Sequence, residues 1–269
     1  MRRIVALSAF SSALALVLAG CTPASDAPPS PAASSPATPQ PAVTAGADAG
    51  ETSEPTTTVV EAQEPTTAYI ARAKSQTVDV LTEPDGAGQV TIRADSVLTV
   101  PEQTPLVFLV DEIQGSWVHV YLPVRPNGSM GWVAADDVVL SATDYRVDIA
   151  LSEFELTVWD GEDLVLTSDI GLGTEDLPTP GGTYYIRELV QPPNPDGAYG
   201  PYAYGLSGYS PVLDEFAGGE AIIGIHGTND PESFGKAVSH GCIRLPNDVI
   251  TEIVEEVGLP LGTPVYIEE

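Results

Sequence analysis

The sequence is poor in basic residues. Only 10 of its 269 residues are Lys or Arg, against 38 Asp and Glu, which gives a formal charge of −28. A protein this acidic offers no basic surface to a phosphate backbone or to anionic lipid head groups, so nucleic acid is excluded as a partner. The acidic residues are scattered singly and in pairs rather than spaced as in a calcium loop, and we interpret them as a solvated surface.

The sequence also has only two cysteines, and the first follows an apolar N-terminal segment. Arg2 and Arg3 precede an apolar run over residues 4–17, which is shorter than the roughly 20 residues that a spanning helix needs. The run leads into Leu-Ala-Gly-Cys at residues 18–21, which resembles the lipobox of bacterial lipoproteins. This resemblance predicts a signal peptide over residues 1–21, lipidation of Cys21, and a protein held outside the cytoplasm on the cell membrane. An ordinary secretory signal is the alternative.

Cys242 is then the only cysteine of the mature chain, which excludes an intramolecular disulfide. A free thiol outside the cell is exposed to oxidation, so either a reactive role or burial in a core must account for it.

Three regions follow the signal. Residues 22–67 consist almost entirely of Ala, Pro, Ser, Thr, Gly and acidic residues with no aromatic side chain, which predicts a disordered linker. At about 3 Å per residue, a stiff proline-rich linker of this length reaches up to on the order of 100 Å. The length of the remaining chain suits two modest domains, over residues 68–141 and 145–269.

Residues 68–141 contain short β-rich runs between Pro, Gly and Asp turn signals, which predict a small barrel or sandwich. The runs cover residues 77–80, 97–100, 105–110 and 117–122. Asn127 and Gly128 form a strong turn signal, and we expect Trp117 and Trp132 to fill the core, with His119 in a structural role. Through residues 115–120 and 131–133 the region resembles a bacterial SH3-like domain.

Residues 145–269 begin with the alternation of a β-meander and contain one strong helix signal. Strands are expected at 145–149, 155–159, 164–170, 183–186, 221–225 and 263–267. The helix is expected over residues 247–257, with Asn247 as N-cap and Gly258 just beyond its end. Residues 191–210 are predicted to form a long loop. Its four tyrosines either line a groove or hold the loop to the sheet: Tyr199, Tyr202, Tyr204 and Tyr209.

The residues with catalytic potential converge after the strand at 221–225. This strand delivers His226 and Gly227, and Ser-His-Gly-Cys at residues 239–242 follows soon afterwards. A cysteine attacks as the thiolate, so an imidazole that takes its proton raises reactivity, and by composition either His226 or His240 could serve. Same-face neighbours such as His240 and Cys242 are about 6 to 7 Å apart in an extended chain, which favours His226 as the base.

Two neighbours of Cys242 are further candidates. Gly241 permits another backbone to come close, and the N–H groups of Gly241 and Cys242 could point at an oxyanion. Arg244 could hold a substrate carboxylate or favour the thiolate; alternatively, it is paired with one of the many acids.

His-Gly-Thr-Asn at residues 226–229 and Ser-His-Gly-Cys-Ile-Arg-Leu at residues 239–245 resemble the signature of the L,D-transpeptidase (YkuD-type) family. The resemblance implies a mainly β protein, in which the SH3-like barrel is followed by a β-sandwich-like catalytic domain with few helices. It implies that Cys242 attacks the carbonyl before the terminal D-Ala of a tetrapeptide stem. The resulting thioester passes to the amine of a neighbouring stem in the cell wall.

The same resemblance assigns roles to the residues of the motif. His226 matches the base, the carbonyl of Gly227 matches the group that orients it, and Ser239, His240 and Gly241 match the lead-in to the nucleophile. Family members carry Arg or Asn at the position of Arg244. We expect a monomer without cofactor or metal that faces the cell wall and binds peptidoglycan stem peptides.

Three other functions fit parts of the sequence. A zinc site could use His226, His240 and Cys242, although no typical zinc-ligand spacing supports it. An L,D-carboxypeptidase would use the same thioester, with water in place of the acceptor amine. A catalytically silent wall-binding lipoprotein would rely on its SH3-like domain alone.

Overall fold

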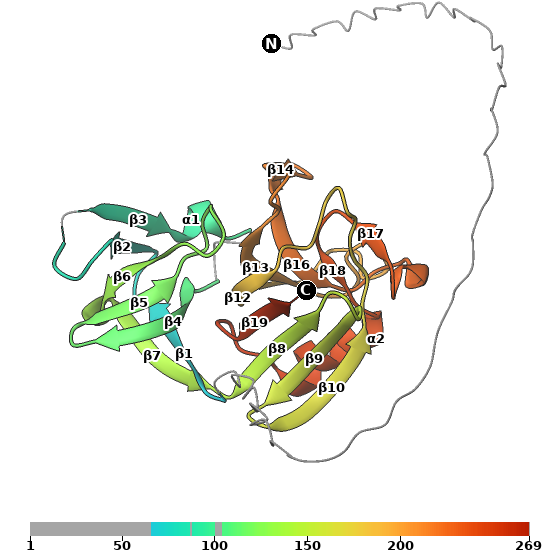
Figure 1. Cartoon of the computed structure of the whole chain (residues 1–269), viewed down its shortest axis with the longest axis horizontal. Coiled ribbons are helices and arrows are strands. Elements are labelled where there is room, and N and C mark those ends of the chain that lie inside the picture. The colour runs from blue at the N-terminus through green and yellow to red at the C-terminus, as the bar shows by residue number, and fades with distance from the viewer. Residues whose placement is uncertain (1–65, 87, 100–103, 269) are drawn as a thin grey trace, which may run out of the picture. The chain divides into compact units, whose positions relative to one another are not determined.

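The computed structural model describes residues 66–86, 88–99 and 104–268, and strands dominate them (Figure 1). The predicted signal peptide, the predicted lipidation site at Cys21 and nearly all of the predicted linker lie outside this part of the chain. Among the described residues, no helix has the length and apolar character needed to cross a bilayer. The expected fold class, mainly β with few helices, is confirmed.

The first of two large sheets has seven strands in the order β3-β2-β6-β5-β4-β1-β7, and all its pairs are antiparallel. We call it the N-terminal sheet. Its strands are β1 (Ala68–Ala73), β2 (Thr77–Leu81), β3 (Gln89–Arg93), β4 (Val107–Gln114), β5 (Trp117–Tyr121), β6 (Met130–Ala134) and β7 (Val138–Thr143). Two short helices accompany it: α1 (Ala94–Val97) and the 3-10 turn η1 (Ala135–Asp137).

The core of the N-terminal sheet differs from the prediction. Strand alternation in β5 buries Val118 and Val120 completely, whereas Trp117 is on the opposite face and only half-buried. Trp132 is also half-buried and stacks on His119, with ring centroids 4.6 Å apart. The two tryptophans therefore cover the outer face of the sheet, and the prediction that they fill its core is wrong.

The predicted strand at residues 97–100 is also wrong where the structure describes it. Val97 ends α1, and Leu98 and Thr99 follow it without strand pairing. Ala94 and Val97 are both buried, because residues three apart in a helical turn lie on one face. The helical turn thus buries the apolar side chains that the sequence pattern had placed in a strand.

The second large sheet, which we call the C-terminal sheet, has eight strands in the order β10-β9-β8-β19-β12-β13-β16-β18. Its strands are β8 (Tyr145–Ala150), β9 (Glu155–Asp160), β10 (Asp163–Asp169), β12 (Gly182–Val190), β13 (Ala203–Tyr209), β16 (Ile222–His226), β18 (Ile243–Arg244) and β19 (Pro264–Glu268). Shorter elements are β11 (Leu172–Gly173), β14 (Glu215–Phe216), β15 (Gly219–Glu220), β17 (Ala237–Ser239) and the 3-10 turn η2 (Pro231–Ser233). The predicted meander is β8, β9 and β10.

Strand β13 corrects the predicted loop, because it occupies Ala203–Tyr209 within residues 191–210. It pairs with β12 on one side and β16 on the other. Gly205 and Gly208 interrupt the apolar alternation that would have revealed it. Within the predicted loop, residues 191–202 and Ser210 are without strand.

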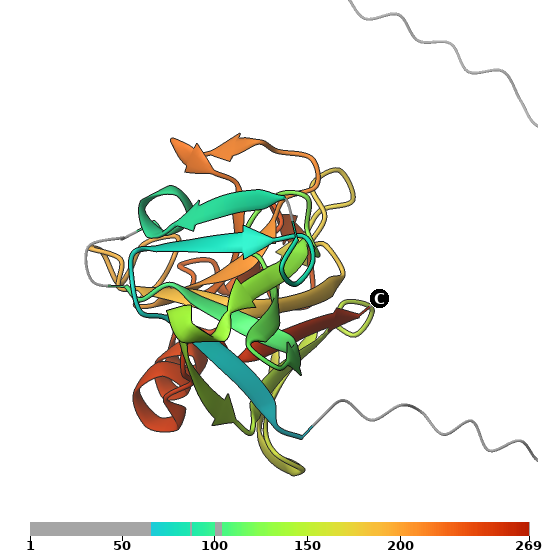
Figure 2. The ribbon, with the colours of Figure 1, turned by 90° about the vertical axis from the view of Figure 1, so that its left-hand side faces the viewer.

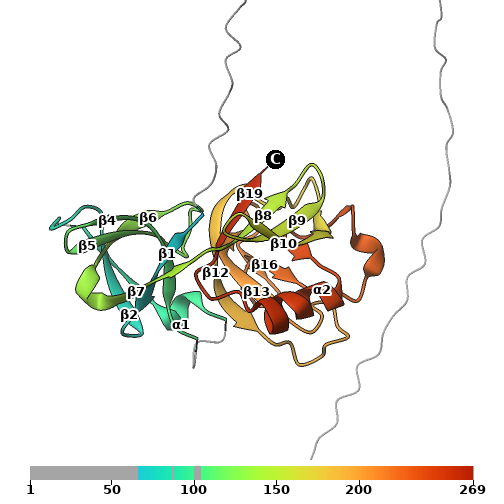
Figure 3. The ribbon, with the colours of Figure 1, turned by 90° about the horizontal axis from the view of Figure 1, so that it is seen from below.

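The predicted helix is present as α2 (Asn247–Glu252), which continues into the π-helical turn η3 (Ile253–Val257). Gly258 ends it in the left-handed conformation with φ 70°, as expected. Pro246 rather than Asn247 is in the N-cap position, so that prediction is wrong. Asn247 Oδ1 instead accepts a hydrogen bond from the Thr228 N–H at 2.8 Å. Figure 3 shows α2 beside the C-terminal sheet, and its Ile250 belongs to the buried core there.

The two sheets contact each other directly. Ile70 and Leu109 of the N-terminal sheet pack with the fully buried Tyr185 of β12. The side chain of Asn127 pairs with the backbone of Tyr209, donating to its carbonyl at 2.8 Å and accepting from its N–H at 2.9 Å. Figure 2 shows the hairpin of β14 and β15, in orange, standing out from the rest of the fold.

Candidate active site

Strand β16 carries His226 at its end, and the ring is buried, with 5% of the residue exposed. Its Nδ1 lies 2.6 Å from the carbonyl oxygen of Gly227. A carbonyl can only accept, so Nδ1 carries the proton and donates it, which leaves the lone pair of Nε2 available to a neighbouring acid. The predicted orienting role of Gly227 therefore agrees with this hydrogen bond.

Cys242 lies beside β16 because β18, which begins at the next residue, pairs with that strand. The parallel register places Ile243 opposite Ile225 and Arg244 opposite His226, so Cys242 comes next to Gly224. The thiol is partly exposed, and Sγ lies 3.9 Å from the carbonyl oxygen of Ile222.

A tight turn before Cys242 fixes its backbone. The hydroxyl of Ser239 donates to the Cys242 carbonyl at 2.6 Å and accepts from the Gly241 N–H at 3.1 Å. Gly241 has φ 116°, and a Cβ there would lie 2.9 Å from Ile223 Cδ1. Glycine is thus required both for its conformation and for the close approach that the sequence indicated.

The turn contradicts one predicted role of Gly241. Its N–H was expected to be free for an oxyanion, but it is bound to the Ser239 hydroxyl. The carbonyl of Gly241 is also occupied, because it accepts from Thr179 Oγ1 at 2.9 Å. Thr179 Oγ1 in turn accepts from the Gly173 N–H at 2.9 Å. The sequence analysis did not identify Thr179 as part of the site.

Burial and a nearby cation set the protonation of the pair. Burial raises the pKa of the Cys242 thiol, although a backbone hydrogen bond with Gly224 and the charge of Arg244 oppose that effect. Burial lowers the pKa of His226 to about 4; the Gly227 hydrogen bond raises it, and Arg244 lowers it further. At neutral pH the resting pair is therefore a neutral thiol and a neutral imidazole.

The remaining predicted residues surround this pair. Arg244 Nη1 lies 3.3 Å from Asp230 Oδ2, so the alternative of pairing with an acid describes the structure. His240 is exposed, and its ring lies 5.1 Å from that of Phe216. Tyr199 packs on His226 at 4.7 Å between ring centroids. The sequence analysis did not identify Phe216, which reaches the site from the hairpin of β14 and β15.

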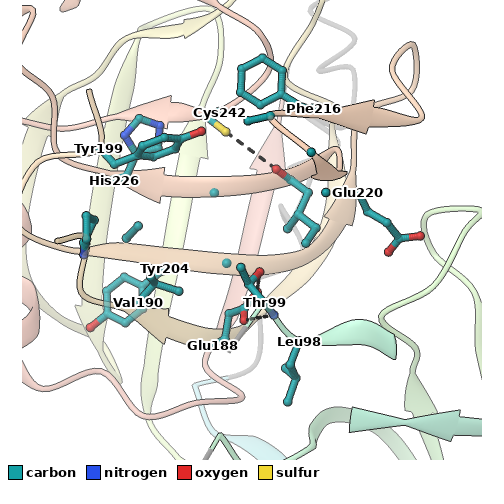
Figure 4. A pocket seen from close by; sticks show the side chains of 18 of the residues that line it. Leu98, Thr99, Glu188, Val190, Tyr199, Tyr204, Phe216, Glu220, His226 and Cys242 are labelled. Carbon is teal, nitrogen blue, oxygen red and sulfur yellow. Dashed lines mark hydrogen bonds between the residues drawn. The ribbon is translucent and has the colours of Figure 1, made fainter. Parts of the chain in front are cut away.

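Cys242 and His226 open into one cavity of about 630 Å³ (Figure 4). This volume falls in the range of small-ligand sites. Of the four tyrosines considered, Tyr199 and Tyr204 line the cavity. Tyr202 instead donates a hydrogen bond to Glu255 at 2.6 Å, and Tyr209 is buried. A thiol and an oriented imidazole that line the same cavity form an arrangement suited to nucleophilic catalysis.

The described residues contain no cluster of three or more His, Cys, Asp or Glu side chains arranged to hold a metal ion. A zinc site built from His226, His240 and Cys242 thus finds no support in the positions of these side chains.

Residues 144–267 match the family model of the L,D-transpeptidase catalytic domain, YkuD. A YkuD protein of Bacillus licheniformis is 37% identical over 153 residues, which cover 54% of this chain and 83% of that protein. The YkuD protein of Bacillus subtilis is 32% identical over 152 residues, with the same coverage. Both are described provisionally as L,D-transpeptidases. A solved L,D-transpeptidase from Mycobacterium smegmatis is 16% identical with a TM-score of 0.38, covering 62% of this chain and 91% of that one.

The chain belongs to the YkuD family of L,D-transpeptidases. Its catalytic domain is the part built on the C-terminal sheet, which carries both Cys242 and His226.

Proposed function

We propose that the protein is a peptidoglycan L,D-transpeptidase with Cys242 as nucleophile and His226 as its base. One observation carries the proposal: both side chains line the same cavity, and the Nδ1–H of His226 is committed to the Gly227 carbonyl. The free lone pair of Nε2 is what a general base needs. The reaction class, acyl transfer by an L,D-transpeptidase, is inferred from the chain's membership of that family.

The first half of the reaction forms a thioester. As Sγ of Cys242 attacks the carbonyl between the third residue of a stem and its terminal D-Ala, the thiol proton passes to Nε2 of His226. The imidazolium then gives this proton to the departing amine, so the carbon–nitrogen bond breaks and D-Ala leaves. The acyl part of the stem remains bound to sulfur.

The second half transfers the acyl group. An amine from another stem attacks the thioester carbon and loses a proton to His226, and the new amide forms as the carbon–sulfur bond breaks. The imidazolium returns its proton to the sulfur, so the neutral pair is restored. We infer that Arg244 acts by its charge, which favours anionic sulfur at both stages and can attract the stem's terminal carboxylate.

The setting that we propose is the outer face of the cell membrane. Lipid on Cys21 would anchor the chain, the linker would extend the folded part toward the wall, and stem peptides would be the partners of a monomer that needs no cofactor. The N-terminal sheet would correspond to the SH3-like domain. Ser239 and Gly241 would act by holding the backbone of Cys242, and His240 would lie at the entrance to the cavity beside Phe216.

The proposal is tested by mass spectrometry of the intact chain with a tetrapeptide stem, with and without a second stem as acceptor. We expect loss of D-Ala, an acyl adduct on Cys242, and a cross-linked dimer when the acceptor is present. Cys242→Ala should abolish all three, and His226→Ala should reduce turnover more than the matched variant His240→Ala. Full turnover by Cys242→Ala refutes the nucleophile, and tripeptide without any dimer in the presence of acceptor refutes transpeptidation.

A further inference from the structure

The cavity is not built by the C-terminal sheet alone. Its lining includes Ser96, Val97, Leu98 and Thr99, which form the end of α1 and the two residues after it. These four residues, which we call the end wall, belong to the region of the N-terminal sheet and precede Cys242 by more than a hundred residues of sequence. In Figure 4, Leu98 and Thr99 lie at the opposite end of the labelled side chains from Cys242.

A buried carboxylate holds the end wall in place. Glu188 of β12 accepts from the Thr99 N–H at 2.6 Å and from the Thr99 hydroxyl at 2.8 Å. The residue is 1% exposed, and its charge is balanced by Arg187, also 1% exposed, at 3.3 Å. A buried carboxylate without such partners would cost several kcal/mol. The position of Thr99 is thus set by the need to satisfy Glu188.

The same charged pair is tied to the rest of the contact between the sheets. Arg187 Nη1 donates to the Tyr209 hydroxyl at 3.0 Å, and that hydroxyl donates to the Pro123 carbonyl at 2.6 Å. Pro123 follows β5, so both ends of this chain of hydrogen bonds reach the N-terminal sheet. Movement of Thr99 would remove the two hydrogen bonds that connect the end wall to this network.

A flat floor joins the end wall to the thiol. The strand registers align Glu188 with Gly205 and Gly205 with Gly224, and Cys242 is the next residue in the same row. A Cβ at Gly205 would lie 2.6 Å from Glu188 Oε1, so only glycine fits there. The Glu188 side chain therefore covers Gly205, whereas only backbone atoms of Tyr204 lie within 4 Å of a Cβ built at Gly224. A bound peptide can lie close to the sheet backbone at Gly224 and against the Glu188 side chain beyond it.

The length of this floor exceeds what the leaving group needs. Neighbouring strands are about 4.8 Å apart, so the three spacings from Cys242 to Glu188 span roughly 14 Å. At about 3.3 Å per residue, an extended peptide of roughly four residues covers that distance. The leaving D-Ala of the proposed reaction is a single residue, and the remainder of the stem is on the other side of the carbonyl that is attacked.

We propose that the floor and the end wall form the subsite for the acyl-donor stem on the N-terminal side of the reacting carbonyl. The stem lies over Gly224 and over the Glu188 side chain that covers Gly205, and it ends against Leu98 and Thr99. Thr99 thus determines specificity for stem length, and Glu188 is its positioning residue. This inference rests on the proposed function. Under this proposal, the region of the N-terminal sheet contributes to the substrate site through its end wall, in addition to any role it has in binding the cell wall.

The test uses the intact chain and a series of donor peptides that all end in D-Ala and are shortened one residue at a time from the other end. Ser96→Phe fills the cavity from an exposed position of the end wall. We expect it to raise KM for the full tetrapeptide about tenfold at unchanged kcat, and to leave KM for the two-residue donor within about twofold. Asp95→Phe is the matched control, because it adds the same ring on the same helix outside the cavity lining.

A second pair of variants tests the hydrogen bond between the Thr99 hydroxyl and Glu188. Thr99→Val keeps the shape of the side chain but removes the hydroxyl that Glu188 binds, and should raise KM for the tetrapeptide about fivefold. Thr99→Ser restores the hydroxyl and should restore KM.

Each result bears on one proposal. A KM for Ser96→Phe that changes equally for all donor lengths, or a control Asp95→Phe that matches it, overturns the end-wall subsite. If the wild-type chain forms no adduct with any donor, the proposed function itself is refuted. The donor series therefore distinguishes failure of the proposed function from failure of the subsite alone.

Discussion

Acidification should destabilise the fold through His226. Burial lowers the pKa of this imidazole to about 4, whereas in the unfolded chain it titrates near 6.5. Between these two values the unfolded state binds a proton that the folded state does not. Stability is therefore fully present above the unfolded pKa and is lost as the pH falls from about 6.5 to about 4.

The size of this loss of stability follows from the shift in the pKa of His226. A difference of about 2.5 units at about 1.4 kcal/mol per unit gives a total loss of about 3 kcal/mol. By pH 5, about 2 kcal/mol of this should already be gone, because the unfolded imidazole is nearly all protonated there while the folded one is not. In a domain stabilised by about 5 to 15 kcal/mol, such a loss is large.

Urea unfolding at pH 7 and pH 5 measures the loss, with the free energy of unfolding taken from the linear extrapolation. Carboxylates also contribute to acid lability, so the informative quantity is the difference between the wild type and His226→Gln, in which those contributions cancel. We expect the variant to lose about 2 kcal/mol less than the wild type over this interval. The matched variant His240→Gln, which removes an exposed imidazole, should lose as much as the wild type. Equal losses in the wild type and His226→Gln would refute the reasoning.

Two further predictions concern the turn and the thiol. Thr179→Val removes the hydroxyl that joins the Gly173 N–H to the Gly241 carbonyl, and should lower the free energy of unfolding by about 1 to 3 kcal/mol. Denaturant titration measures this free energy, and an unchanged unfolding midpoint would contradict a structural role for the Thr179 hydroxyl. Burial raises the pKa of Cys242, so its alkylation by iodoacetamide at pH 7 should be slower than that of a free cysteine and should accelerate above pH 9. Fast alkylation at pH 6 would show a preformed thiolate.

The sequence revealed most where the chemistry is local. His226, Gly227 and Cys242 were identified because they occur in two short motifs, and the structure places both motifs at one cavity. The hydrogen-bond acceptor of the Gly241 N–H could not be predicted in the same way. It depends on whether the Ser239 hydroxyl or a substrate oxygen competes better for it, and that is decided by the fold of the turn.

Other features of the fold and the site could not be predicted, because the periodicity of the sequence does not determine them. Alternation in β5 places Trp117 with His119 on one face and Val118 on the other, but it does not say which face is the core. The large apolar surface of tryptophan suggested the wrong face. Thr179, Phe216 and the end wall come from segments far from the motifs, so only the strand registers and long-range hydrogen bonds bring them to the site.

The hydrogen bonds between Thr99 and Glu188 constrain how such a chain can evolve. Proteins often gain or exchange a domain when the exchanged part and the catalytic part share few contacts. Here an exchange would remove both hydrogen bonds that Thr99 donates to Glu188 and would open one side of the cavity. We therefore expect the N-terminal region and the catalytic domain to be exchanged only together, and substitutions at positions 99 and 188 to be accepted only as compatible pairs.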